Sequence, residues 1–235
     1  MGSEMCIRDR PMTMQTDVFA VELARMAAQW ESIASEPNPV PGWELEIARM
    51  RDHQDRLRAA GQWRTGGRTL LHVLWVHHNE VMMCRGLAWL LTPDGWHGLG
   101  TAVLDRLLDR LGVPTEGSAR AVVTTEESRG DTRADVLVRF EGVAVLIEAK
   151  IWALEQRHQA DRLAHDFGEE MPHLVFLTRE GNYPGTAVTS RGRWHPITWS
   201  TIAEIVALGV STMPDCEPGV KEYLRTLEIY GGTGR

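Results

Sequence analysis

The segment from Arg133 to Lys150 restricts the folds open to this chain more than any other part of the sequence. Two runs with a period-two alternation of side chains, typical of strands, lie on either side of the dipeptide Glu141-Gly142. If this dipeptide is a two-residue turn, Asp135 lies across from Glu148, and Lys150 falls on the same face. The opposite face of the hairpin is continuously apolar, so we expect that face to be buried.

Asp135 and Glu148 are two like charges that this pairing brings close together, and they repel each other unless a cation lies between them. A hard divalent metal ion, which takes oxygen ligands, accounts for such a pair. The hairpin therefore predicts a metal site formed by these two carboxylates, with the amine of Lys150 beside it. The alternative is a polar strand face on which the three charges lie by chance.

An Asp, a following strand and then Glu-x-Lys, here Asp135, Glu148 and Lys150, form a pattern that resembles the PD-(D/E)XK nuclease superfamily. The resemblance continues in chain order through residues 70–178, which are similar to one uncharacterised bacterial branch of that superfamily. The matching residues before the hairpin are Asn79-Glu80, Leu87-Ala88-Trp89-Leu90-Leu91, Pro93 and His97-Gly98-Leu99-Gly100. Those at its end and after it are Lys150-Ile151, Ala153, Glu155-Gln156 and Gln159.

The resemblance implies a metal-dependent nuclease that hydrolyses phosphodiester bonds, with Mg²⁺ as the cofactor and Mn²⁺ able to replace it. Asp135, Glu148 and the backbone carbonyl of Ala149 are then the expected metal ligands. Lys150 is expected to orient or activate the attacking water, and Gln159 to be a further catalytic residue. The implied fold is mixed α/β, with a restriction-endonuclease-like core.

Glu80 stands at the start of a helix that the sequence predicts directly after Asn79, its N-cap. The carboxylate of Glu80 either extends the metal site, as the resemblance implies, or is simply favourable at the positive end of a helix. Glu126 and Glu127 pose a similar question at the end of a strand predicted over residues 120–127. Each could join the acidic cluster or keep an edge strand soluble, and the sequence leaves both explanations open.

Lys150 departs from the chain's general choice of basic residue. Its only lysines are Lys150 and Lys221, so Arg supplies nearly all of the positive charge. Arg is effectively always protonated, whereas a Lys beside a metal can lose its proton. This difference favours a role for Lys150 in proton transfer.

Three parts follow one another along the chain. Residues 1–16 are expected to be a disordered or artefactual leader, because Met5-Cys6-Ile7-Arg8-Asp9 looks like a translated sequencing adapter. Residues 17–62 are expected to form an N-terminal helical arm around a Pro-rich stretch. Residues 63–235 are expected to form the nuclease-like domain, in which helices flank a central mixed sheet and outside which the arm packs.

Periodicity and capping signals predict the remaining elements. The helix after Lys150 is expected to bury Gln156 on the same side as Leu163. A capping box from Thr201 to Glu204 is expected to open the first of two closing helices. Helices are predicted over residues 17–35, 43–60, 97–111 and 153–167, and two further strands over residues 174–178 and 194–199.

The net charge of −7 gives no general attraction to nucleic acid, so any binding must come from local arginines and the metal. DNA is the expected partner, in DNA processing or in defence against foreign DNA, and a homodimer is one expected state. Two alternatives stay open: a metal-dependent ribonuclease, and a nuclease fold that serves as a non-catalytic binding or scaffold module. The intact Asp, Glu and Lys argue against the scaffold.

The sequence contains no apolar run long enough to span a membrane and no hydrophobic signal segment at its N-terminus. We therefore expect no membrane partner and a cytoplasmic location. Cys6, Cys84 and Cys216 have neither paired nor metal-ligand spacing, so neither a disulfide framework nor a zinc knuckle is expected.

Overall fold

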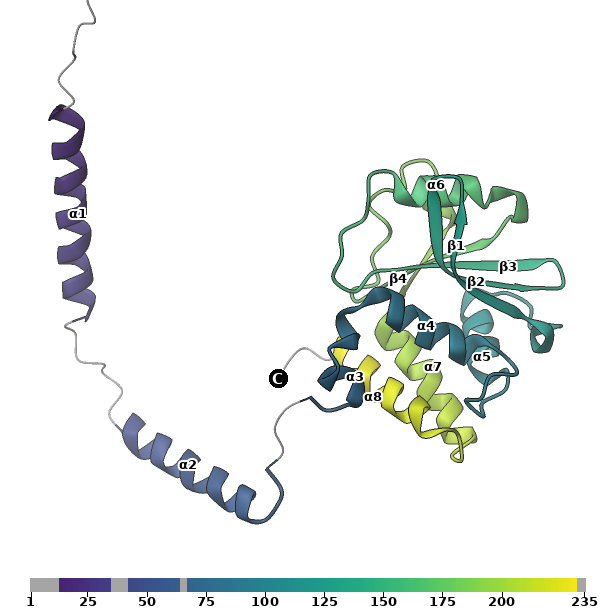
Figure 1. Ribbon diagram of the computed structural model, residues 1–235, viewed down its shortest axis with the longest axis horizontal. Helices are drawn as coiled ribbons and strands as arrows, with labels where there is room; N and C mark the ends of the chain where they lie inside the picture. The colour runs from purple at the N-terminus through teal and green to yellow at the C-terminus, as the bar shows by residue number, and fades with distance from the viewer. Residues whose placement is uncertain (1–12, 35–41, 64–66, 232–235) are drawn as a thin grey trace, which may run out of the picture. The chain divides into compact units, whose positions relative to one another are not determined.

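The computed structural model describes residues 13–34, 42–63 and 67–231. The chain divides into two compact units, Met1–Thr65 and Gly66–Arg235 (Figure 1). Within the described residues, no helix is both long enough and apolar enough to cross a membrane.

The first unit contains two helices, α1 (Thr13–Ala34) and α2 (Trp43–Ala59). Both were predicted, although α1 begins at Thr13 and so includes the end of the predicted leader. Residues 1–12 of that leader and the Pro-rich stretch at residues 35–41 lie outside the described residues. Acidic residues in the first turn of α2 and arginines in its last turn complement the helix dipole.

A five-stranded mixed sheet forms the centre of the second unit in the described part of the chain, as the sequence predicted. The strand order follows the chain order, β1-β2-β3-β4-β5. The first three strands are antiparallel to one another, whereas β3, β4 and β5 are parallel. The strands are β1 (Val122–Arg129), β2 (Thr132–Phe140), β3 (Val143–Ala149), β4 (His173–Thr178) and β5 (Trp194–Thr198).

The hairpin between β2 and β3 has the predicted register. Phe140 pairs with Val143, and the pairing continues to Val136 with Ile147. Glu141 and Gly142 have positive φ angles of 42° and 79°, which a two-residue turn of the type I′ class requires and which matches the twist of the strands.

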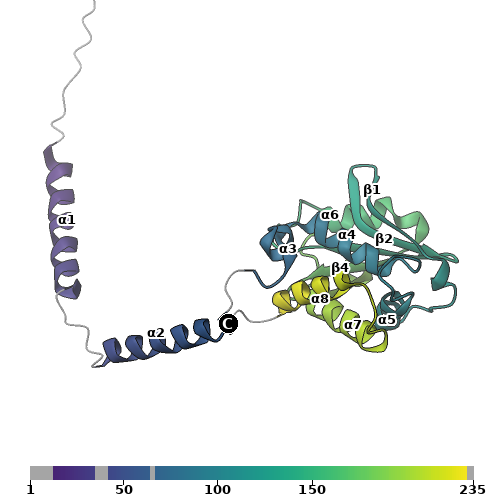
Figure 2. The ribbon, with the colours of Figure 1, turned by 60° about the horizontal axis from the view of Figure 1, so that its bottom comes forward.

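Helices cover both faces of this sheet (Figures 1 and 2). One face packs on α4, α5, α7 and α8 through an apolar core that includes Val138 and Val145, and this is the face that the sequence predicted to be buried. The other face packs on α6 through a second core that includes Leu137, Leu146 and Leu163. The helices of this unit are α3 (Leu70–Val73), α4 (Glu80–Leu91), α5 (Ala102–Leu111), α6 (Gln159–Asp166), α7 (Trp199–Thr212) and α8 (Pro218–Gly231). Short 3₁₀ segments are η1 (Val76–His78), η2 (Ser118–Arg120), η3 (Gly168–Glu170) and η4 (Arg191–Arg193).

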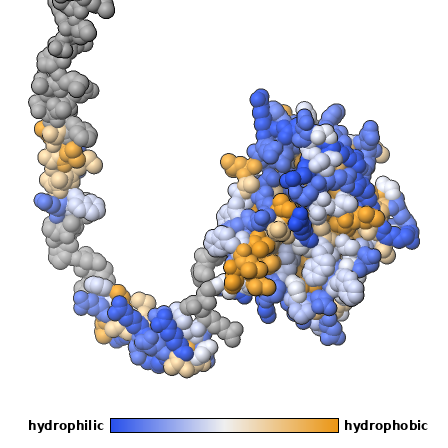
Figure 3. All heavy atoms as spheres, in the orientation of Figure 1, coloured by the Kyte–Doolittle hydropathy of each residue, from blue (hydrophilic) through white to orange (hydrophobic). Residues whose placement is uncertain are grey.

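The helix α3 is attached to α8 and leaves apolar side chains at the surface. Thr69 and Thr226 hydrogen-bond through their hydroxyl groups at 2.8 Å. Leu70, Val73 and Leu74 are each more than half exposed, and they form an apolar patch beside the otherwise more polar surface of this view (Figure 3).

The helix predicted to begin at His97 begins instead at Ala102. Gly98 and Gly100 have positive φ angles of 75° and 55°, which a right-handed helix cannot contain. The ring of His97 stabilises the turn, because its Nδ1 accepts the N–H of Leu99 at 3.0 Å. His97 therefore belongs to the turn before α5. The apolar side of α5 itself is buried, as the sequence predicted.

The helix predicted to follow Lys150 directly was also placed too early, because α6 begins at Gln159. His158 has a φ of 53°, so the chain cannot pass through it as a right-handed helix. Gln156 consequently lies in the loop before α6 and is exposed, in contrast to its predicted burial.

The capping box predicted at Thr201 is wrong by three residues. Thr198, at the end of β5, is the N-cap of α7, and its side chain accepts the N–H of Thr201 at 3.0 Å. The extended backbone of Thr198 suits an N-cap, so the helix begins at Trp199 directly after the strand.

Candidate active site

Asp135 and Glu148 lie next to each other on β2 and β3. Asp135 directly precedes Val136 and Glu148 directly follows Ile147, the last registered pair, so the antiparallel pairing places the two carboxylates across from each other. Oδ2 of Asp135 accepts the N–H of Ala149 at 2.8 Å, which fixes the Asp135 carboxylate against the end of β3. The hairpin thus brings the two predicted carboxylates together.

The two oxygens of the Glu148 carboxylate have different surroundings. Oε1 accepts hydrogen bonds from Nζ of Lys150 and from Nε2 of Gln159, each at 2.6 Å. Oε2 is buried and has no hydrogen-bond partner among the described residues, and we call it the open oxygen of Glu148. A buried oxygen without a donor costs free energy, so this atom marks a place where a positive ligand would be stabilised.

The ammonium group of Lys150 lies among three oxygen groups of the site. Its Nζ is 2.6 Å from Oε1 of Glu148 and 3.8 Å from Oε2 of Glu80. The same nitrogen donates to the backbone carbonyl of Ala149 at 3.2 Å. The side chain of Lys150 is only 14% exposed, so these interactions are shielded from solvent.

Two more elements hold the backbone of Lys150 in place. Its N–H donates to the carbonyl of Leu177 on β4 at 2.8 Å. Its carbonyl accepts the indole N–H of Trp199, the buried first residue of α7, at 3.2 Å. The residue therefore sits on a rigid part of the fold, as a positioned catalytic group requires.

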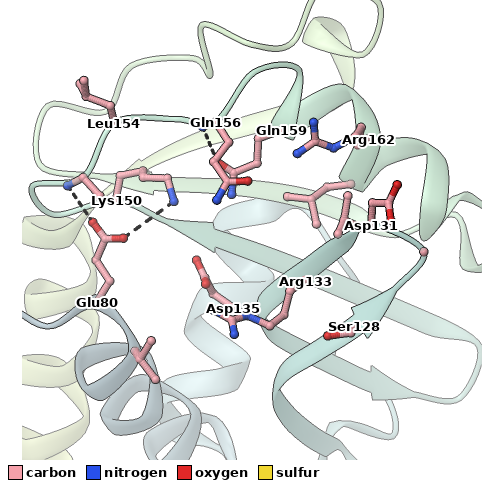
Figure 4. A pocket seen from close by; sticks show the side chains of 15 residues that line it. Glu80, Ser128, Asp131, Arg133, Asp135, Lys150, Leu154, Gln156, Gln159 and Arg162 are labelled. Atoms are coloured by element: carbon pink, nitrogen blue, oxygen red, sulfur yellow. Dashed lines mark hydrogen bonds and ion pairs between the residues drawn. The ribbon is translucent and has the colours of Figure 1, made fainter.

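Glu80 reaches the site from the start of α4, directly after the predicted N-cap Asn79. Its Oε1 accepts three backbone N–H groups of the loop after β3, from Ile151 at 2.9 Å, Ala153 at 3.1 Å and Trp152 at 3.3 Å. Its Oε2 faces the ammonium of Lys150 (Figure 4). A favourable position at the helix end does not account for these contacts, so Glu80 belongs to the site in space.

Gln159, the first residue of α6, also reaches the site. Its Nε2 donates to Oε1 of Glu148, and its Oε1 accepts the N–H of Gln156 at 3.1 Å. The side chain therefore ties the loop before α6 to the buried carboxylate. Its role in catalysis remains a prediction.

The site is short of positive charge, and the pKa values of its groups reflect this. Burial, followed by the charge of Asp135, raises the pKa of Glu148 to about 8. Burial also raises the pKa of Asp135. Burial acts to lower the pKa of Lys150, but the hydrogen bond to Glu148 and the negative charges of Glu148, Asp135 and Glu80 together outweigh burial, so the pKa of Lys150 is raised. Without a metal, the ammonium stays protonated, in contrast to the depressed pKa expected beside a metal.

A pocket of about 500 Å³ opens above these residues (Figure 4). Its walls come from the start of α4, the turn between β1 and β2, the loop after β3, and α6. A volume of this size suits a single small ligand or one unit of a polymer, since ligand sites range over roughly 300–1,000 Å³. Ionisable and amide side chains that line it are Glu80, Asp131, Arg133, Asp135, Lys150, Gln156, Gln159 and Arg162.

The oxygen groups of Asp135, Glu148 and Ala149 suit a hard cation such as Mg²⁺. The open oxygen of Glu148 beside Asp135 fits this ligand set. In the described part of the chain, no three His, Cys, Asp or Glu side chains are already arranged around a common metal position. The ammonium of Lys150 lies between the carboxylates of Glu80 and Glu148 instead.

Glu126 and Glu127 have different surroundings in the structure. Glu127 forms a two-point ion pair with Arg139, at 2.8 Å and 2.6 Å, and the hydrogen bonds from Arg139 lower its pKa to about 2. It therefore belongs to a structural network rather than to the pocket. Glu126 is skipped in the pairing of β1 with β2 and has a φ of 56°, which marks a β-bulge. Its charge helps to raise the pKa of Asp135, so Glu126 lies on the side of the acidic cluster.

Sequence reasoning did not select Arg133 or Arg162, which line the same pocket. Arg133 stands at the start of the first strand of the hairpin pattern, but no motif distinguished it from other arginines of an Arg-rich chain. Arg162 follows Gln159 by three positions on α6 and lies within the helix that the sequence predicted, but the pattern of that helix did not show which side faces a pocket.

The chain matches no protein-family model, no curated protein and no solved structure. The chemistry of the site must therefore be inferred from its own residues. Asp135, Lys150 and Gln159 line the open pocket. The buried carboxylate of Glu148 and the carbonyl of Ala149 are hydrogen-bonded to these lining residues rather than lining the pocket themselves.

Proposed function

We propose that this chain is a metal-dependent nuclease with a restriction-endonuclease-like core of the PD-(D/E)XK type, which hydrolyses phosphodiester bonds in DNA. The observation that carries the proposal is the open oxygen of Glu148, which lies across the hairpin from Asp135 and beside the amine of Lys150. Crowding of buried negative charge costs free energy of folding. Its presence therefore supports a site that binds a positive ligand.

Asp135, Glu148 and the carbonyl of Ala149 would hold Mg²⁺, or Mn²⁺ in its place, and Glu80 would add its Oε2 from the side of α4. When bound, such a cation lowers the pKa of water and offsets negative charge at the phosphoryl group. The Asp135 carboxylate is already fixed by the N–H of Ala149, which reduces the cost of ordering it on binding.

Lys150 would hold and move a proton at the attacking water, because its Nζ lines the pocket and is bonded to Glu148. Gln159 would position the Glu148 carboxylate through its bond to Oε1. Glu80 would position the loop after Lys150 through its bonds to three backbone N–H groups.

DNA is the proposed substrate class, with a role in DNA processing or in defence against foreign DNA. The chain carries a net charge of −7, so local arginines at the pocket must supply the attraction for a phosphodiester backbone. Arg133 and Arg162 line the pocket and could do so.

The experiment is incubation of the purified protein with linear duplex, circular duplex and single-stranded DNA, and with RNA. Each substrate is tested with Mg²⁺, with Mn²⁺ and with EDTA, and Asp135→Asn serves as the control protein. The proposal predicts metal-dependent cleavage of DNA that the control lacks. Cleavage of RNA alone would identify a ribonuclease, and metal-dependent binding without cleavage of any substrate would identify a binding module.

A further inference from the structure

Arg162 lines the pocket, and one N–H group of its guanidinium has no acceptor among the described residues. Arg162 lies three residues after Gln159 on α6, and side chains with this spacing share one side of a helix. Both residues line the pocket. Nη1 of Arg162 donates to the carbonyl of Arg157 at 2.5 Å, whereas its Nε is buried and finds no acceptor among the described residues.

The acids that adjoin Arg162 on α6 are engaged elsewhere. Asp161 accepts the backbone N–H groups of Val188, Thr189 and Ser190, at 2.9 to 3.2 Å. Asp166 accepts the hydroxyl of Thr132 at 2.9 Å. Within the described ranges, Arg162 forms no ion pair with a carboxylate, so its charge is not neutralised by the protein.

Arg133 adds a second guanidinium to the lining of the pocket. One of its nitrogens lies 3.0 Å from Oε2 of Glu126, the residue of the β-bulge, and this ion pair fixes the side chain while other N–H groups remain available. Asp131 also lines the pocket, and because Asp131 and Arg133 are both exposed, solvent and salt screen both charges.

Arg162 lies apart from Glu80 and Lys150. Figure 4 shows Glu80 and Lys150 on one side of the pocket, Arg162 with Asp131 on the opposite side, and Asp135 with Arg133 between them. A phosphate bound at the carboxylates through a metal therefore does not also satisfy Arg162. A second anionic group of the same ligand would be needed to pair with Arg162.

We propose that Arg162, assisted by Arg133, binds the phosphate of the strand next to the phosphate that is cleaved. This inference rests on the proposed nuclease function and adds the smallest substrate that the pocket recognises, a strand with two consecutive phosphodiester groups. Planar guanidinium groups bind phosphate oxygens through paired N–H groups, and the carbonyl of Arg157 engages Nη1 of Arg162 without neutralising its charge. Arg162 is thus a positioning residue for the substrate and not part of the metal site.

The test uses a short fluorescein-labelled DNA strand and a series of strands in which one phosphate at a time is replaced by an uncharged methylphosphonate. Binding is measured by fluorescence anisotropy with Ca²⁺ in place of Mg²⁺, for the wild type, Arg162→Ala and Arg162→Lys. Arg157→Ala is the matched control, because Arg157 is exposed, does not line the pocket, and keeps the carbonyl that Arg162 contacts. Thermal unfolding of each variant confirms that it is folded.

In the wild type, one methylphosphonate position beside the cleaved phosphate is expected to weaken binding by roughly tenfold, the value of a hydrogen bond to a charged group. Arg162→Ala should weaken binding of the unmodified strand by a similar factor and should lose sensitivity at that position only. Arg162→Lys should recover part of the binding, since Lys keeps the charge but not the paired N–H groups. Arg157→Ala should behave as the wild type does.

Unchanged sensitivity of Arg162→Ala at every position would overturn the proposal, and so would a wild type that binds none of the strands. A uniform loss of affinity at all positions would overturn it too, because it would indicate general charge attraction. The anisotropy signal needs no cleavage. If Arg162→Ala loses sensitivity at one position but the wild type cleaves no substrate, the nuclease proposal is refuted and the phosphate site is kept. If the wild type cleaves DNA with metal but Arg162→Ala keeps its sensitivity at every position, the phosphate site is refuted and the nuclease is kept.

Discussion

Lys150 and Glu148 form an ion pair at the end of β3, with 2.6 Å between Nζ and Oε1, while Oε2 of the same carboxylate has no partner among the described residues. One carboxylate therefore touches the group assigned to proton transfer and also presents the oxygen assigned to a metal. The two roles can be separated by substitution, because an amine and an oxygen ligand contribute differently to binding and to hydrolysis.

Replacement of Lys150 by Ala should keep or increase the affinity for Mn²⁺, because it removes a positive charge from the cluster. Cleavage should fall by roughly 10²–10⁴-fold, the usual contribution of a positioned proton-transfer group. Lys150→Arg should restore little activity, since Arg keeps the charge but does not readily release a proton. Single-turnover cleavage beside Mn²⁺ titration measures both effects.

The matched control is Lys221→Ala, which removes the only other lysine of the chain. Lys221 donates to the carbonyl of Pro214 on the surface and should leave cleavage unchanged. Full activity in Lys150→Ala would show that no amine takes part in activation of the water.

Replacement of Glu148 by Gln should stabilise the protein in EDTA while abolishing metal-dependent cleavage. Gln keeps an acceptor for Lys150 and Gln159, and its amide nitrogen can donate to Asp135, where the carboxylate of Glu148 is only repelled. The free energy of unfolding should rise by about 1–3 kcal/mol, the cost of a buried polar atom without a partner. Chemical denaturation of Glu148→Gln and of Glu204→Gln, an exposed acid on α7, measures the difference. Lower stability of Glu148→Gln would mean that Glu148 serves the fold rather than a ligand.

The ion pairs of Glu127 predict how stability depends on pH outside the site. The pKa of Glu127 is lowered from 4.5 to about 2 by its hydrogen bonds from Arg139. A carboxylate with a lowered pKa in the folded state contributes stability above its unfolded pKa, and this contribution is lost as the pH falls through the folded value.

The wild type should therefore lose stability between about pH 4.5 and pH 2 more steeply than Glu127→Gln. The difference should be about 1 kcal/mol, because solvent screens the partly exposed network. Urea denaturation across this pH range measures it, with Asp131→Asn in the exposed turn after β1 as the control. If the free energy of unfolding depends on pH in the same way in the wild type and in Glu127→Gln, the ion pairs of Glu127 do not stabilise the fold.

The central hairpin could be predicted from the sequence because its information is local. Alternating apolar residues on both sides of Glu141-Gly142 fix the strands, the turn and the register together, and the register alone places Asp135 across from Glu148. Asn79 likewise predicted the start of α4, because N-capping depends only on residues that are neighbours in the chain.

The features that the sequence missed depend on contacts between distant residues. The loop before α6 was predicted as helix. Its backbone N–H of Ile151 donates to Glu80, 71 positions earlier in the chain, and a contact over that distance leaves no periodic pattern in the sequence of the loop. The bulge at Glu126 is likewise set by pairing with β2 rather than by its own residue type. Arg162 lies in the predicted helix, but its place at the pocket depends on how α6 packs on the sheet, and the sequence of the helix alone does not show this packing.

Titration calorimetry of Mn²⁺ is the measurement that tests the metal site most directly. The wild type and Lys221→Ala should bind the ion with the same saturable heat. Asp135→Ala and Glu148→Ala should give none, because each supplies an oxygen ligand at the same position. Asp135→Asn, which keeps an acceptor for the N–H of Ala149 and so preserves the hairpin, should also fail to bind. Saturable Mn²⁺ binding of unchanged affinity in Asp135→Ala and Asp135→Asn would contradict the account, because the metal would then be held by other residues.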